Sequence, residues 1–291
     1  MISIIITAYK EAQSIKKCID SFLSQNIKEN YEIIVLAPDE ETLESAGKYK
    51  KVITIKDSGK GKPTALNLAF MAAKGSILIL TDGDVYAGKN SVNELLEKLK
   101  DKKTGAVSGR AISTNPRNTM LGFWSHLLTD RGAHEERKRL SKENKFLACS
   151  GYLYAVRKGV IESIPNNSLS DDAVISHIIY KKGYKIDYAE KAEVYVKYPT
   201  NLKDWIKQKR RSIGGYVQIS KWFPENKGMR TFSKESSHFF KALSYCKNIK
   251  EPFYFIILVI FRIYVWLLTI WDLKITKKEF SKIWQRVEST K

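Results

Sequence analysis

A run of apolar residues that ends in two aspartates constrains this chain more than any other feature. Residues 77–80 read Ile-Leu-Ile-Leu, and Thr81-Asp82-Gly83-Asp84 follows directly. A short, unbroken apolar run is typical of a strand buried on both faces of a parallel sheet. Because open α/β sheets bind ligands at the carboxyl ends of their strands, we expect the two carboxylates to lie at a ligand site. An Asp-Gly-Asp turn in a surface loop is the alternative from this tripeptide alone.

The same two aspartates suit a divalent cation. Carboxylates are hard oxygen ligands, and the flexible glycine between Asp82 and Asp84 allows both to face one ion. We therefore expect Asp84 and Asp82 to bind Mg²⁺ or Mn²⁺.

The first third of the chain alternates strand-like and helix-like segments. Apolar runs predict strands at residues 2–7, 31–36, 51–55 and 77–80, and helical spacing predicts helices at residues 12–25, 40–48 and 64–73. A basic, glycine-rich loop at residues 57–63 precedes the last of these helices. This alternation predicts an α/β fold with a doubly wound, mostly parallel sheet flanked by helices.

The following segments are less regular. We expect helices at residues 91–100, 120–140, 173–182 and 201–219, and strands at residues 105–109, 185–189 and 192–198. Residues 146–156 are mostly apolar but contain Ser150-Gly151, which indicates a strand, a turn and a second strand. The composition changes after about Trp222, so we divide the chain into an α/β domain, residues 1–222, and a basic C-terminal region, residues 223–291.

The C-terminal region contains an almost unbroken apolar stretch from Phe253 to Trp271, which is near the length that spans a bilayer. Arg262 in its middle would cost roughly 2.5–3.5 kcal/mol on insertion, which about a dozen apolar residues at roughly 0.3–0.6 kcal/mol each offset. Lysines flank the stretch on both sides, which opposes a single span and fits a re-entrant or in-plane helix. We therefore expect an apolar helix that associates with a membrane, in a geometry left open; a buried core helix is the alternative.

The formal net charge of +19 favours anionic partners such as phosphates or an acidic lipid surface. Zinc-finger spacing and a helix-turn-helix signal are missing from the sequence, so nucleic acid is not an expected partner. The three cysteines are widely spaced, and the N-terminus lacks the pattern of a secretory signal. These features predict that the main domain is cytoplasmic and that the protein is associated with a membrane.

Several segments, in order, resemble the inverting family 2 glycosyltransferases, which have a GT-A fold and a DxD motif. The resemblance covers roughly residues 1–216 and is carried by IIITAYKEAQSIKKCIDSFLSQ, GKGKPTALNLAF, ILTDGD, CSGYLYAVRKGVIESI, SDDAVISHIIYKKGYKI and QKRRS. These correspond to the family's opening strand and nucleotide-side loop, its glycine-lysine loop, its DxD motif, its acceptor-side segment, the segment with the catalytic carboxylate, and its Gln-x-x-Arg-Trp motif.

The resemblance implies a role for each matching residue. Asp84 and Asp82 would hold the metal ion across the diphosphate of a nucleotide sugar. Asp172 would be the catalytic base that deprotonates the acceptor hydroxyl, and Asp171 would support it. The residues implied in binding the nucleotide sugar are Thr7, Ala8, Tyr9, Glu11, Asp39, Lys60, Lys62, Asp82, Gly83, Gln208, Arg210 and Arg211.

Local sequence allows other interpretations of these residues. Ser170 is a good N-cap, and Asp171 and Asp172 would stabilise a first helical turn in any protein. The lysines of the glycine-rich loop fit a solvated turn equally well, and Arg210 and Arg211 fit an exposed basic helix surface.

The sequence also departs from the family pattern. Ala37-Pro38-Asp39-Glu40 stands where the family has an Asp-Asp-Gly-Ser-like loop, so Asp39 would substitute there. Ser212 replaces the tryptophan of the Gln-x-x-Arg-Trp motif, and one apolar segment is too few for the channel of a processive synthase. The serine at position 212 and the single apolar segment both favour the addition of a single sugar.

We therefore expect a metal-dependent, inverting glycosyltransferase. It would move one sugar from a UDP- or GDP-sugar donor to a lipid-linked or glycan acceptor at the cytosolic face of a membrane. The alternatives are a sugar nucleotidyltransferase, which would need an arginine-containing glycine-rich loop after the first strand, and a non-enzymatic basic protein that binds nucleic acid or membranes.

Overall fold

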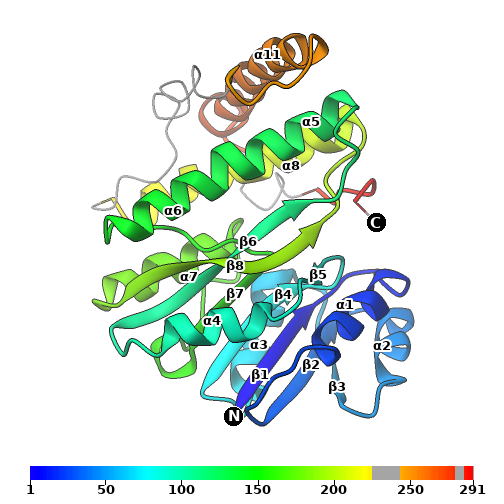
Figure 1. The fold of residues 1–291 in the computed structure, drawn as a ribbon, viewed down its shortest axis with the longest axis vertical. Helices are drawn as coiled ribbons and strands as arrows, with labels where there is room; N and C mark the ends of the chain where they lie inside the picture. The colour runs from blue at the N-terminus through cyan, green and yellow to red at the C-terminus, as the bar shows by residue number, and fades with distance from the viewer. Residues whose placement is uncertain (225–242, 279–284, 291) are drawn as a thin grey trace.

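The computed structural model describes residues 1–224, 243–278 and 285–290, and within them eight strands form one mixed sheet covered by helices on both faces (Figure 1). The strands are β1 (Ile2–Thr7), β2 (Tyr31–Ala37), β3 (Val52–Lys56), β4 (Ile77–Asp82), β5 (Tyr86–Ala87), β6 (Thr104–Ser113), β7 (Leu153–Arg157) and β8 (Lys185–Val196). Their order across the sheet is β3-β2-β1-β4-β7-β6-β8-β5. Strands β3, β2, β1 and β4 are parallel, as are β6 and β8, whereas β7 is antiparallel to both its neighbours and β5 is antiparallel to β8. The predicted fold class is confirmed.

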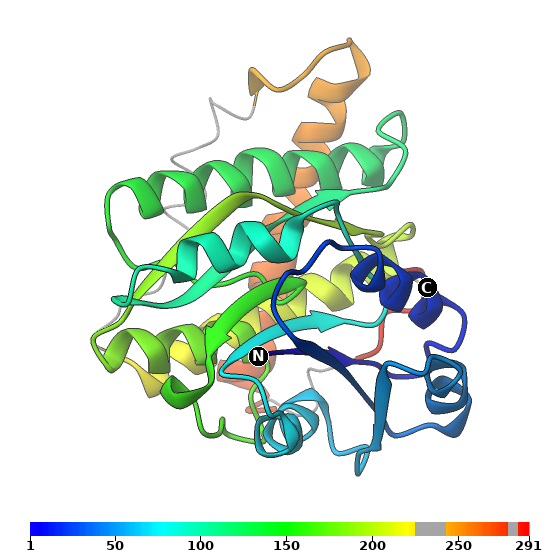
Figure 2. The same cartoon turned by 60° about the horizontal axis from the view of Figure 1, so that its bottom comes forward.

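Most helices connect these strands or pack on the sheet, whereas the last one packs on two other helices (Figure 2). They are α1 (Ser14–Leu23), α2 (Glu40–Gly47), α3 (Lys62–Ala72), α4 (Ser91–Leu99), α5 (Met120–Leu127), α6 (Glu135–Lys142), α7 (Asp171–Lys181), α8 (Leu202–Trp222) and α11 (Lys250–Ile270). Two core clusters lie on opposite faces of the sheet: Ile4 and Ile6 of β1 belong to one, with α1, and Ile5 belongs to the other, with α3. Because strand side chains alternate between faces, this division explains why Ile4, Ile5 and Ile6 are apolar in succession.

The segment predicted as a strand, a turn and a second strand contains one strand only, β7. The backbone before it pairs with side chains: the amide of Cys149 donates to Oγ of Ser176 at 2.9 Å, and the amide of Ser150 donates to Oγ of Ser108 at 3.0 Å. These hydroxyls accept the hydrogen bonds that the carbonyl groups of a neighbouring strand would otherwise accept. The two predicted strands at residues 185–189 and 192–198 are the single strand β8.

The helix predicted over residues 120–140 is interrupted by a π-helical stretch, Leu128–His134, between α5 and α6. π-helical stretches are rare and are frequent at functional sites. Gly132 and Arg131 of this stretch line the main cavity of the protein, described below.

The apolar C-terminal helix α11 continues into a π-helical stretch, Trp271–Ile275. It lies beside α5 and α8 at the end of the molecule away from β1–β3 (Figure 1). Phe255, Leu258 and Val265 of α11 form a third apolar cluster with Trp124 of α5 and Trp205 of α8. The segment Lys250–Ile275 is long and apolar enough, by length and composition, to cross a membrane.

Candidate active site

The carboxyl ends of β1 and β4 open into a cavity of about 1810 Å³. The parallel register places Thr7 beside Asp82, so the loops that follow the two strands meet at one edge of the sheet. Single-ligand pockets are usually roughly 300–1,000 Å³, so this cavity has room for two substrates. The predicted site residues that line it are Thr7, Ala8, Tyr9, Glu11, Lys60, Lys62, Asp82, Asp84, Asp171, Asp172, Gln208 and Arg211.

Gly83 is packed so closely that its position admits no side chain. Its amide donates to the carbonyl oxygen of Thr7 at 3.0 Å. A Cβ atom there would lie 2.4 Å from Oε2 of Glu11 and 2.8 Å from Cβ of Ala8. The glycine of the Asp-Gly-Asp sequence therefore lets the end of β4 approach the loop after β1, with Asp82 and Asp84 on either side.

Lys62 joins the two acidic groups of the cavity. Lys62 is the first residue of α3, and its Nζ lies 2.5 Å from Oδ1 of Asp82 and 3.3 Å from Oδ2 of Asp171. Burial alone would lower the pKa of Lys62, but the charges of Asp171 and Asp82 outweigh it and raise the pKa well above its ordinary value. Lys62 thus stays cationic, and it brings the end of β4 and the start of α7 together.

Asp172 is held by backbone amides from two segments. Its Oδ2 accepts from the amide of Gly151 at 2.8 Å, and its Oδ1 accepts from the amide of Ala173 at 2.8 Å. Burial and the neighbouring charge of Asp171 raise the pKa of Asp172, while Lys62 opposes the rise. A carboxylate whose pKa is raised is a stronger base in its ionised form.

The helix-capping alternative is incorrect for Ser170. This residue occupies the N-cap position of α7, but its side chain makes no capping hydrogen bond to the described backbone. Asp171 and Asp172 do lie in the first turn of α7, as that alternative expects, and the carboxylate of Asp172 also accepts from the amide of Gly151.

Arg210 and Arg211 are adjacent on α8 but have different surroundings. Arg211 lines the cavity with Gln208 and Ser212. Arg210 is not among the described residues that line the cavity, and it forms an ion pair with the buried carboxylate of Asp272. This ion pair connects α8 to the C-terminal region, and the contact of Arg210 with phosphate stays a prediction.

Asp39 is also not among the described residues that line the cavity. Its Oδ1 accepts from the amide of Thr42 at 3.1 Å and caps α2, and its Oδ2 accepts from the amide of Lys10 at 2.8 Å. Burial would raise the pKa of Asp39, but these hydrogen bonds and that of the Thr42 hydroxyl outweigh it and lower the pKa. Its placement suggests that it shapes the loop after β1.

The C-terminal segment also lines the cavity, which the sequence analysis missed. Arg286 lies over the ring of Tyr9, 5.1 Å from its centroid, and donates to the carbonyl oxygen of Lys10 at 3.2 Å. The amides of Glu288 and Ser289 donate to Oδ2 of Asp204 at 3.1 and 2.9 Å. No local sequence pattern indicates a contact between residues so far apart in the chain.

A divalent ion at Asp82 and Asp84 would need further ligands besides these two carboxylates. Within the described residues no group of three or more His, Cys, Asp or Glu side chains could enclose a metal. Mg²⁺ is usually bound by one or two carboxylates plus water and substrate phosphates, which fits a pair of aspartates that faces a cavity. The Lys62 ammonium beside Asp82 shows that this carboxylate accommodates a cation.

The sequence model of the family described as "Glycosyltransferase like family 2" matches residues 1–215. The chain is 27% identical over 229 residues to the "Probable glycosyltransferase YdaM" of Bacillus subtilis. This match covers 74% of this chain and 54% of that protein. It is also 27% identical over 165 residues to the hyaluronan synthase of Streptococcus pyogenes. That match covers 52% of this chain and 39% of the synthase. The chain thus spans only about half or less of the length of these relatives.

Solved structures share the fold. The mannosyltransferase PcManGT of Pyrobaculum calidifontis, in complex with GDP-Man and Mn²⁺, matches with a TM-score of 0.60 and 20% identity over 94% of this chain and 71% of that chain. Residues 1–349 of S. aureus TarS, in complex with UDP-GlcNAc, match with a TM-score of 0.54 and 16% identity over 75% of this chain and 66% of that chain. At these identities the likeness establishes the fold alone.

Proposed function

Because this chain belongs to the glycosyltransferase-like family 2, we propose that it transfers a single sugar from a UDP- or GDP-sugar to a lipid-linked or glycan acceptor, with inversion at the anomeric carbon. Residues 1–222 would form the cytoplasmic catalytic domain, and residues 223–291 would attach it to a membrane. The observation that carries the proposal is the contact of one ammonium group, that of Lys62, with both Asp82 and Asp171. This contact supports a site in which the metal carboxylates and the catalytic base act on one substrate.

The donor would bind at the ends of β1 and β4. Asp84 and Asp82 would hold Mg²⁺ or Mn²⁺, and the ion would neutralise charge on the diphosphate. Lys62, Lys60 and Arg211 line the same cavity and would contact phosphate oxygens. The loop from Thr7 to Glu11 and residues Gly83 and Gln208 would complete the donor site. The GDP-Man and UDP-GlcNAc complexes of the two structural neighbours support this class of donor.

Asp172 would act on the acceptor. Its carboxylate would accept the proton of the acceptor hydroxyl while that oxygen forms a bond to the anomeric carbon. The bond from that carbon to the diphosphate would break in the same step, the nucleoside diphosphate would leave, and the configuration would invert. The Gly151 amide holds Asp172 in place, and Asp171 raises its pKa, so both would serve the base.

The acceptor side supports single addition. Ser212 lines the cavity where the family motif has a tryptophan, and it offers no aromatic surface on which a growing sugar chain could stack. Ile263 of α11 lines the cavity and is 41% exposed, so it offers apolar surface to an acceptor that carries a lipid.

Product identity distinguishes this proposal from a sugar nucleotidyltransferase. Incubation with a nucleoside triphosphate and a sugar 1-phosphate should yield no pyrophosphate, whereas a nucleotide sugar with Mn²⁺ and a lipid extract should yield nucleoside diphosphate. Release of pyrophosphate that depends on Asp84 would establish the nucleotidyltransferase instead. Nucleic-acid binding that weakens with salt and persists in Asp82→Ala/Asp84→Ala, without either product, would support the non-enzymatic alternative.

A further inference from the structure

One side of α11 exposes a continuous apolar stripe. Phe253, Ile256, Ile260, Tyr264 and Leu267 are between 50% and 64% exposed. They follow one another at intervals of three or four residues, so they lie on one face of the helix. We call these five residues the α11 stripe. Large apolar surfaces on a soluble protein mark sites that bind a partner or a membrane.

The opposite face of α11 is packed on the catalytic part of the chain. Phe255, Leu258 and Val265 are at most 4% exposed and contact residues of α5 and α8. Nε1 of Trp124 on α5 donates to the carbonyl oxygen of Tyr254 at 2.6 Å. The helix is therefore an integral part of the domain along its length.

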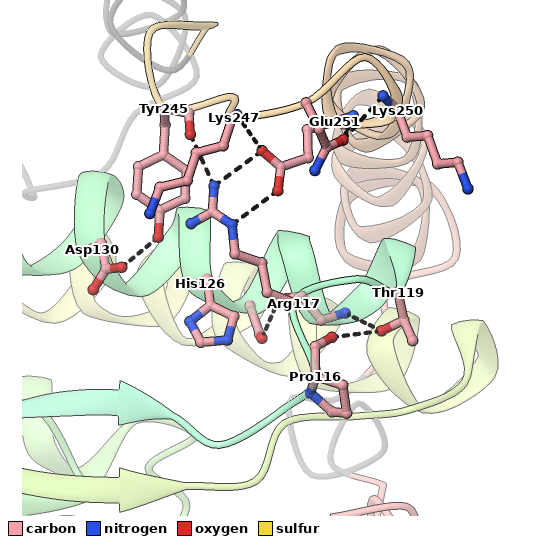
Figure 3. Close-up of polar contacts among 12 residues, drawn as sticks. Pro116, Arg117, Thr119, His126, Asp130, Tyr245, Lys247, Lys250 and Glu251 are labelled. Atoms are coloured by element: carbon pink, nitrogen blue, oxygen red, sulfur yellow. Dashed lines mark hydrogen bonds and ion pairs between the residues drawn. The ribbon is translucent and has the colours of Figure 1, made fainter.

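A buried ion pair attaches the N-terminal end of α11 (Figure 3). The side chain of Glu251 is 3% exposed, and its carboxylate accepts from Nε and Nη2 of Arg117 at 2.9 and 3.1 Å. The same carboxylate accepts from the amide of Lys247 at 2.6 Å, and Tyr245 donates its hydroxyl hydrogen bond to Asp130. Arg117 lies just before α5, so this cluster fixes the start of α11 to the catalytic domain.

A second buried ion pair attaches the other end. Asp272, in the π-helical stretch after α11, has a side chain that is 3% exposed. It pairs with Arg210 of α8 and with Nζ of Lys278 at 2.6 Å. To cross a bilayer away from the domain, α11 would have to separate both pairs and leave charges without partners. The two pairs therefore hold α11 flat against the domain.

The charges around α11 match a lipid surface. The acidic residues of segment 243–278 are Glu251 and Asp272, and both are buried in ion pairs. The lysines at its two ends are exposed: Lys247, Lys250, Lys274, Lys277 and Lys278. Exposed lysines at both ends of an apolar stripe are typical of helices that lie in the interface of an anionic membrane.

We propose that α11 lies in the plane of an anionic lipid surface, with the α11 stripe in the acyl region and the lysines of both ends at the head groups. This proposal deepens the membrane association proposed above, and it does not depend on the transfer reaction.

Ile263, next to the stripe, is 41% exposed and also lines the cavity. The cavity therefore opens beside the lipid-facing side of α11, where a lipid-anchored acceptor could reach Asp172. Arg262 lines the cavity too, so its charged group can lie in the cavity and not in the acyl region.

Sedimentation with vesicles tests the surface. The full chain should bind phosphatidylcholine vesicles that contain phosphatidylglycerol, and more weakly those that lack it. Ile256→Glu/Ile260→Glu/Leu267→Glu should weaken binding by at least roughly tenfold, because burial of the stripe is lost. Met71→Glu is the matched control, because Met71 is 77% exposed but lies on α3. Equal vesicle binding by the triple variant and the control would overturn the proposal, provided that both variants retain nucleotide binding.

Cysteine labelling tests the orientation. In a Cys246→Ser background, Lys247→Cys and Lys277→Cys should both react with a membrane-impermeant maleimide on the same side of sealed vesicles from expressing cells. Labelling in detergent confirms that each cysteine is reactive. Reaction from opposite sides would mean that α11 spans the bilayer, and would overturn the proposal. So would a dimer in lipid-free solution that the triple variant converts to a monomer, because a second copy would then cover the stripe.

Discussion

The ammonium group of Lys62 lies 2.5 Å from the carboxylate of Asp82, so a cation already contacts one of the two residues proposed to bind the metal. The same ammonium lies 3.3 Å from Asp171, next to the proposed base. Lys62 thus balances the charges of Asp82 and Asp171, at both ends of the proposed reacting centre. Its raised pKa keeps it protonated over the pH range of an assay.

Replacement of this lysine tests its role. Lys62→Met should lower kcat/KM for the nucleotide sugar by roughly 10- to 100-fold, because hydrogen bonds to charged groups contribute about 1.5–3 kcal/mol. Lys74→Met, an exposed lysine just after α3, should leave kcat/KM unchanged. Steady-state kinetics of both variants provide the comparison. Unaltered kinetics in Lys62→Met would show that this lysine does not contribute to donor binding or to transfer.

The pH profile reports the environment of Asp172. Burial and Asp171 raise its pKa, and a general base works only when ionised, so kcat/KM should fall on acidification at a pH above about 3.9, the ordinary value for aspartate. Asp171→Asn removes the like charge and lowers the pKa of Asp172. The acid limb of the profile should therefore move to lower pH in this variant, whatever the change in absolute rate. A limb that stays in place or moves to higher pH would contradict the proposed coupling.

Gly83 offers a test of the close approach between β4 and the loop after β1. Gly83→Ala would place a methyl group 2.4 Å from Oε2 of Glu11, so the loop must move and donor affinity should fall by roughly tenfold or more. Gly159→Ala is the control, since no atom lies within 4 Å of the added methyl group. Calorimetric titration with the nucleoside diphosphate measures both. Equal affinities would show that the packing at Gly83 does not serve the donor site.

The ion pair between Arg117 and Glu251 should stabilise the attachment of α11. Glu251→Gln should lower the free energy of unfolding by about 3 kcal/mol, the lower end of the range for buried pairs because the Arg117 side chain is 24% exposed. The double variant Arg117→Met/Glu251→Leu should recover most of this loss, since no buried charge is left unpaired. Urea unfolding of Arg117→Met, Glu251→Leu and the double variant, each compared with the wild type, gives the coupling energy. A coupling near zero would show that the pair does not hold the helix.

The parts of the fold that follow from local pattern could be predicted from the sequence. The apolar runs of β1, β2 and β4 are buried on both faces of the sheet, and the alternation with helices led to the correct fold class. Most of the predicted site residues line one cavity, because the carboxyl ends of parallel strands must meet at one edge.

The remaining features depend on contacts between distant segments. Arg210 and Arg211 are neighbours in sequence, but they point in different directions from α8. Arg210 pairs with Asp272 and Arg211 lines the cavity, and local sequence does not distinguish them. The support of Asp172 by the amide of Gly151 also carries no sequence signal, because any residue provides an amide. The position of Arg286 beside Tyr9 joins the two ends of the chain.

The measurement that tests the central claim most directly is release of nucleoside diphosphate from a panel of UDP- and GDP-sugars, with Mn²⁺ or EDTA, by the wild type, Asp84→Ala and Asp172→Asn. We expect release from one donor that requires Mn²⁺ and is lost in Asp84→Ala. Asp172→Asn should bind the same donor but release product roughly 10²- to 10⁴-fold more slowly, as expected for loss of a general base. Full activity of Asp172→Asn, or release that EDTA does not affect, would contradict the account.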